Sequence, residues 1–181
     1  MEREGCRLGG IGGLRRARLA LALAGLCVLL ASGCGDEEQP KRGALPAPVA
    51  EKRDAISVAA KRLDYASLGR LLDSTTFSYS FGETGAPIAY WRRLERKGEV
   101  PVVGDYLPTV LAAPVGRRAN IYVWPAVHAK KPSMWTAADL RWLRTLYSAQ
   151  EVRAFKRAGA YLGWRAGIRR DGKWLFFIAG D

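Results

Sequence analysis

The chain has 181 residues, 49% of them hydrophobic, and a formal net charge of +12 at pH 7. This length allows one domain with a real hydrophobic core. With one histidine and three cysteines, two of them in an N-terminal leader, the sequence excludes a zinc site, and it has no Walker-type loop, Gly-x-Ser-x-Gly elbow or His-Glu-x-x-His pair. We therefore expect no metal and no other cofactor.

Residues 1–33 have the organisation of a signal peptide for export. Arg15, Arg16 and Arg18 precede an uncharged apolar run over 19–30. About a dozen residues at a helical rise of 1.5 Å fall short of the ~30 Å bilayer core, so we expect a cleaved signal rather than a spanning helix. General secretion is favoured over twin-arginine export, because Arg18 stands where the twin-arginine signal has an apolar residue.

The leader ends in Leu30-Ala31-Ser32-Gly33-Cys34, which resembles the lipobox of bacterial lipoproteins. The resemblance implies cleavage between Gly33 and Cys34 and attachment of diacylglyceryl to the Cys34 sulfur. The protein is then expected to be a lipoprotein of the cell membrane that faces the extracytoplasmic side, in the periplasm or the cell-wall space. The alternative is a plain secretory signal with an accidental cysteine.

Residues 34–48 are expected to form a tether. They contain acidic residues, then basic residues, three prolines and almost nothing to bury. A segment of this length has a root-mean-square span of roughly 20 Å. The globular domain is expected over 49–181.

Apolar periodicity predicts a helix over 49–63, and Asp64 is placed to cap a second, short helix. Pro87 and Gly98 bracket a third helix in the usual arrangement of N-terminal proline and C-terminal glycine. Asp105 is placed to cap a fourth helix that ends before Pro114.

Two capping-box patterns predict two more helices, one at Thr136 with Asp139 and one at Ser148 with Glu151. Gly159 can close the second of these in a left-handed conformation.

Alternating side chains predict strands over 76–82 and 120–124, and Asp171-Gly172 predicts a hairpin between 161–170 and 173–178. A two-residue loop pairs Gly167 with Phe176, so that the Phe176 ring can lie over the glycine backbone. The same register pairs Arg169 with Trp174, where the guanidinium can stack on the indole. One face is then core: Trp164, Ala166, Ile168, Leu175, Phe177 and Ala179.

These elements predict an α+β domain, with a small antiparallel sheet of about four strands that ends in the C-terminal hairpin and packs with five or six helices. The opening helices, the strand from Phe77 and the ending GWRAGIRRDGKWLFFIAGD resemble the nuclear-transport-factor-2-like superfamily. That resemblance implies a cone-shaped fold with a pocket between helices and a curved sheet. It supplies no catalytic residue.

The candidate site residues are aromatic residues and one histidine. A pocket is the place where polar aromatic tips find partners, which makes Tyr79, Tyr90, Tyr122 and Trp124 candidate ligand-binding residues. His128, in a loop, is a candidate catalytic residue that needs an orienting carboxylate such as Glu83 or Asp105. The alternative readings are ordinary core aromatics and a surface histidine.

The charge of the mature chain suggests a second type of partner. The leader carries five arginines against two glutamates, so +9 of the +12 remains on residues 34–181. Outside the cytoplasm nucleic acid is not an expected partner, whereas anionic lipid or wall polymer is. The predicted basic face consists of Arg92, Arg96, Arg153, Arg157, Arg165 and Arg169. The alternative is that these arginines only solvate helix faces.

Three functions remain open from the sequence. The leading one is a lipid-anchored, non-catalytic binding or structural domain whose ligand is unknown. The second is an extracytoplasmic enzyme with a pocket of the nuclear-transport-factor-2-like type. The third is electrostatic association of the domain with anionic lipid or wall polymer. No sequence pattern points to a particular protein partner or oligomeric state.

Overall fold

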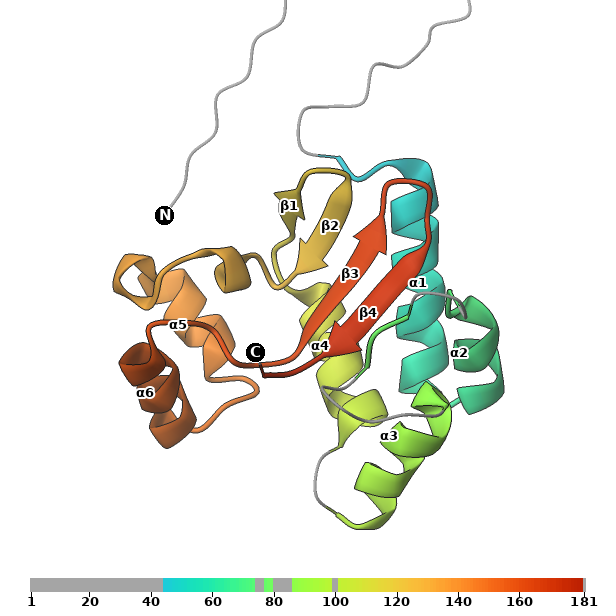
Figure 1. The fold of residues 1–181 in the computed structure, drawn as a ribbon, viewed down its shortest axis with the longest axis horizontal. Coiled ribbons are helices and arrows are strands. Elements are labelled where there is room, and N and C mark those ends of the chain that lie inside the picture. The colour runs from blue at the N-terminus through green and yellow to red at the C-terminus, as the bar shows by residue number, and fades with distance from the viewer. Residues whose placement is uncertain (1–43, 74–76, 80–85, 99–100, 181) are drawn as a thin grey trace, which may run out of the picture. The chain divides into compact units, whose positions relative to one another are not determined.

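The computed structural model describes residues 44–73, 77–79, 86–98 and 101–180 (Figure 1). The helices of this part are α1 (Ala47–Lys61), α2 (Tyr65–Leu71), α3 (Pro87–Arg96), α4 (Leu107–Ala112), α5 (Ala137–Leu143) and α6 (Ala149–Ala158). The strands are β1 (Gly116–Arg118), β2 (Ile121–Trp124), β3 (Arg165–Arg169) and β4 (Trp174–Ile178). No helix among the described residues is long and apolar enough to cross a bilayer.

The four strands form one antiparallel sheet in the order β1-β2-β3-β4, which confirms the predicted α+β class (Figure 1). The predicted strand over 76–82 lies partly outside the described residues. Its described part, 77–79, makes a parallel bridge to the edge of β4, where the Ser78 N–H donates to the Leu175 carbonyl at 2.9 Å. The fourth strand is β1 instead, which no sequence pattern predicted.

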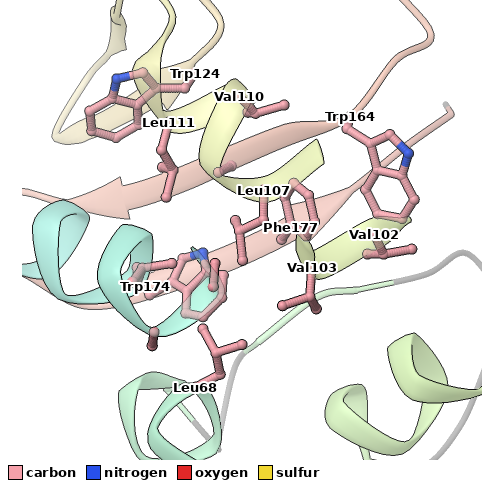
Figure 2. Close-up of a cluster of buried hydrophobic side chains, with 14 of the residues drawn as sticks. Leu68, Val102, Val103, Leu107, Val110, Leu111, Trp124, Trp164, Trp174 and Phe177 are labelled. Atoms are coloured by element: carbon pink, nitrogen blue, oxygen red, sulfur yellow. The ribbon is translucent and has the colours of Figure 1, made fainter. Parts of the chain in front are cut away.

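Helices cover one face of this sheet, and the main core lies between the two layers. Figure 2 shows Leu107, Val110 and Leu111 of α4 facing Trp174 and Phe177 of β4. All five side chains are at most 2% exposed. The two residues of β3 that point the same way are Ala166 and Ile168, both fully buried. Strand alternation therefore leaves the opposite face of the sheet uncovered by this layer.

Most helix ends follow the predicted local signals. The Asp64 carboxylate accepts the Ser67 N–H at the start of α2, at 2.9 Å. Thr136 and Ser148 each close a complete capping box, and Gly159 ends α6 with a φ of 70°. These interactions are confirmed as predicted, because each joins residues within one or two helical turns.

The predicted cap at Asp105 is wrong. Asp105 lies inside a π-helical turn, Val102–Tyr106, that runs directly into α4. The backbone N–H groups of this turn are satisfied from α3, whose Glu95 carboxylate accepts from Val103 at 2.7 Å and from Gly104 at 3.4 Å. Tyr65 also donates its hydroxyl to Glu95. The Glu95 carboxylate, from a different helix, thus accepts the hydrogen bonds that the sequence pattern assigned to Asp105.

The C-terminal hairpin has the predicted turn but a different register near it. The Arg169 N–H donates to the Lys173 carbonyl at 2.8 Å, so the loop holds three residues, and Gly172 has a φ of 85°. This shifts the pairing by one residue, and Ile168 faces Trp174 instead of Leu175. An irregularity between Gly167 and Ile168 shifts it back.

The shift decides which face Trp174 occupies. Trp174 is fully buried among the core aromatics, with its ring 4.9 Å from that of Phe77, whereas Leu175 is only partly buried. The predicted stacking of Arg169 on Trp174 is therefore wrong. The Arg169 guanidinium instead pairs with the Asp171 carboxylate in the turn, at 2.7 Å. Burial of the largest apolar side chain outweighs regular pairing at the hairpin end.

Candidate functional site

The uncovered face of the sheet carries a cavity of about 570 Å³. Its floor comes from alternate residues of β2 and β4, and its sides come from β1, the start of β3, the turn after β2 and the segment after α6. The lining residues are Ser78, Arg118, Ile121, Val123, His128, Ala160, Tyr161, Arg165, Phe176 and Ile178. A volume of this size lies within the range of small-molecule sites, ~300 to 1,000 Å³.

The centre of the floor depends on a glycine. Val123 pairs with Gly167, which pairs with Phe176 on the next strand. A Cβ on Gly167 would lie 2.2 Å from Cε1 of Phe176, so the aromatic ring occupies the space that a side chain would need. The predicted position of the Phe176 ring over the Gly167 backbone is confirmed.

Three basic side chains reach this cavity from different elements. Arg118 is on β1, opposite Ile121, and Arg165 begins β3, opposite Ile178. His128 lies on a 3-10 turn, Ala126–Ala129, that follows β2. Within the described part of the chain, no carboxylate lines the cavity and neither guanidinium has an ion pair or hydrogen bond.

The His128 ring is oriented by the backbone. Its Nδ1 lies 3.0 Å from the Pro125 carbonyl oxygen, which can only accept, so Nδ1 carries the proton and Nε2 is an acceptor in the neutral ring. Burial lowers the pKa of His128; the hydrogen bond to Pro125 opposes this shift, and the positive charges of Arg165 and Arg118 reinforce it. Both guanidinium groups therefore act on the same small region of the cavity.

A ring of hydrogen bonds holds the start of β3 in place. The Trp164 N–H donates to the Tyr147 hydroxyl oxygen, and the Tyr161 hydroxyl donates to the Trp164 carbonyl, both at 2.7 Å. The two hydroxyl oxygens are 3.1 Å apart, and Tyr147 is the donor because the Tyr161 proton is already used. A Cβ on Gly163 would lie 2.3 Å from the Tyr147 oxygen, which explains the glycine.

Burial raises the pKa of Tyr147 to about 12 and raises that of Tyr161 as well. Both hydroxyls therefore stay protonated at neutral pH and maintain the ring of hydrogen bonds with Trp164. Because Trp164 directly precedes Arg165, this ring fixes the backbone from which that guanidinium enters the cavity.

The four aromatic residues predicted to bind a ligand do not line this cavity. The rings of Tyr79 and Tyr90 are 5.3 Å apart at the edge of the main core. Trp124 is buried and Tyr122 partly buried against that same core, on the helix-covered face. A ligand role for these residues stays a prediction.

The six arginines of the predicted basic face lie on different elements. Arg92 and Arg96 belong to α3, and Arg153 and Arg157 to α6, which Figure 1 shows in separate places in the domain. Arg165 is the one of the six that lines the cavity. The single basic face stays a prediction.

The cavity does not bring together the acid–base pair that a catalytic role for His128 requires. Of the two carboxylates considered, Glu83 lies outside the described residues and Asp105 is not among the lining residues. Ser78 shares the cavity with His128, but no hydrogen bond joins the two side chains in the described structure. Unpartnered guanidinium groups beside a neutral imidazole are suited to bind an anion.

Sequence reasoning missed Arg118, because β1 is a three-residue strand of Gly-Arg-Arg without alternating apolar residues. Only its antiparallel pairing with β2 shows which arginine reaches the cavity. Compared with family models, curated proteins and solved structures, the chain matches none of them. The site is therefore argued from its own geometry and charge.

Proposed function

We propose that the protein is a lipid-anchored lipoprotein of the cell envelope whose domain binds a small anionic ligand on the open face of its sheet. One observation supports the ligand class above all others. Arg118, Arg165 and His128 line one cavity to which the described residues contribute no carboxylate. An anion there offsets the positive charge and accepts hydrogen bonds from the guanidinium groups.

The guanidinium group favours ligands with a planar or tetrahedral oxyanion. Its five N–H donors form a rigid fork that matches a carboxylate or phosphate with two parallel hydrogen bonds. Hydrogen bonds to charged groups contribute about 1.5 to 3 kcal/mol each, roughly twice as much as those between neutral groups.

A charge-matched ligand pair tests the pocket. We expect benzoate to bind at least tenfold more tightly than benzamide, which has nearly the same shape without the charge. Calorimetry on the full chain with Cys34→Ala avoids competition from an attached acyl group. Arg165→Gln should remove most of the preference, and Arg153→Gln, on the exposed side of α6, should leave it unchanged. Equal affinities for benzoate and benzamide contradict the proposal.

The lipobox-like ending at Cys34 supports the anchor, and the tether over 34–48 supports a domain held away from the membrane. Two or more acyl chains are needed for stable anchoring, since a single chain is only marginal. Metabolic labelling with a fatty-acid analogue should mark the wild type and not Cys34→Ala. Cys27→Ala is the matched control, because Cys27 leaves with the leader. Equal labelling of all three proteins contradicts the anchor.

The enzyme and the electrostatic alternatives stay predictions. A catalytic role for His128 needs a partner that polarises its ring, and Pro125 supplies a backbone carbonyl there. Association with anionic vesicles needs a binding strength that falls steeply with salt, and a vesicle co-sedimentation series measures it.

A further inference from the structure

The strand register places an apolar row of the cavity between the two rows that carry its arginines. On the open face, Arg118 lies in register with Ile121, and Arg165 lies in register with Ile178. The row between them crosses Val123, Gly167 and Phe176.

This middle row presents no polar side chain on β2, β3 or β4. Successive rows on one face are about 7 Å apart, and the row extends about 10 Å across the three strands. We name this row, Val123-Gly167-Phe176, the apolar strip. It lies between the row that carries Arg118 and the row that carries Arg165.

Building on the proposed anion site, we infer that the ligand is an amphiphilic carboxylate, with its head at the arginines and an unbranched apolar chain along the strip. The strip has both features that such a chain needs. It is flat, because Gly167 has no side chain and the Phe176 ring lies down over it. It is also apolar, and it is partly exposed at Phe176, while Val123 is only 4% exposed; Ile121, in the neighbouring row, is half-buried as well.

A compact inorganic anion is the weaker candidate. Phosphate or sulfate would satisfy the guanidinium groups but leave the partly exposed Phe176 and the flanking Ile121 in contact with water. A chain that covers this surface removes both its own apolar area and that of the strip from water. Ligand sites with an apolar floor and a few placed polar groups favour such mixed ligands.

A chain-length series tests the inference. The probes are butanoate, hexanoate and octanoate, with octan-1-ol and octylammonium as neutral and cationic counterparts, titrated into the full chain with Cys34→Ala. Each added methylene should tighten binding up to about fourfold, the value for complete burial. Ile121→Thr should flatten this dependence. Val58→Thr is the matched control, because Val58 is 49% exposed on α1, outside the cavity.

The outcomes separate this inference from the proposed function. If the three carboxylates bind with equal affinity and still depend on Arg165, the anion site stands and the amphiphilic ligand is wrong. If octan-1-ol binds as tightly as octanoate, or if no probe binds, the anion site itself is wrong. An affinity that rises with chain length for the carboxylates, but stays weak for octylammonium, supports both.

A free fatty acid and an anionic membrane lipid both combine an anionic head with an unbranched apolar chain, but the head of the lipid is a phosphate and not a carboxylate. Vesicles of phosphatidylglycerol, compared with phosphatidylcholine, distinguish them as competitors of bound octanoate. Displacement by phosphatidylglycerol alone assigns the site to a membrane lipid, and no displacement assigns it to the free acid.

Discussion

Anion binding should be coupled to protonation of His128. In the free protein, burial lowers the pKa of His128, and Arg165 and Arg118 lower it further, so the ring is neutral at pH 7. A bound carboxylate adds a negative charge next to the ring. An opposite charge within about 4 to 6 Å favours the charged form of a histidine and therefore raises its pKa.

The direction in which affinity changes with pH follows from the linkage between ligand binding and protonation. The pKa of His128 is higher in the complex than in the free protein, so the complex takes up a proton at any pH between the two values. The affinity for hexanoate should therefore fall as pH rises through that range, and then level off. One unit of difference between the two pKa values corresponds to a tenfold change in affinity. We expect hexanoate to bind more weakly at pH 8 than at pH 5.5; over this range the ligand's carboxylate, with a pKa of about 4 to 5, stays ionised.

The pKa of His128 can be measured directly, because it is the only histidine in the chain. Nitrogen-15 NMR of a histidine-labelled sample reports its pKa without assignment, with and without hexanoate. Tyr161 also lines the cavity, but burial raises its pKa, so it does not titrate in this range.

Two variants check the cause. Arg165→Gln removes one of the positive charges that act on the ring, so it should raise the pKa of His128 in the free protein and reduce the change caused by hexanoate. His128→Gln should make the affinity independent of pH. The reasoning is refuted if hexanoate binds and the His128 pKa is the same in the free and bound protein.

Three further predictions concern stability, each measured as the free energy of unfolding from urea denaturation. Gly167→Ala should lower the free energy of unfolding by about 1 to 3 kcal/mol, because the new methyl group contacts the Phe176 ring. In a Phe176→Ala background the same substitution should cost nothing, and an unchanged cost there contradicts this cause. Tyr161→Phe should cost about 1 to 3 kcal/mol by opening the hydrogen-bonded ring, whereas Tyr122→Phe, whose hydroxyl has no hydrogen bond among the described residues, should cost less than about 0.5 kcal/mol. Ser148→Ala should cost about 1 kcal/mol by removing a capping box, and Ser148→Thr should restore most of it.

The strand pattern shows where local rules stop. Alternation correctly placed Phe177 in the core and Phe176 over Gly167. It failed at Trp174, because a three-residue loop and a compensating irregularity moved this side chain to the other face. Loop length near an Asp-Gly turn depends on which register buries more apolar surface, and that requires knowledge of the helices that pack on the strand.

The sequence by itself determined the α+β class and most helix boundaries, because capping and periodicity depend on residues close together in the chain. The export signal stays a prediction. Tertiary structure decided the composition of the site. Arg118, His128 and Arg165 are brought to one cavity by the pairing of β1 with β2 and of β2 with β3. Residues about ten and forty positions apart have no sequence spacing that predicts such a meeting, since the sheet that joins them forms only when the core behind it is buried.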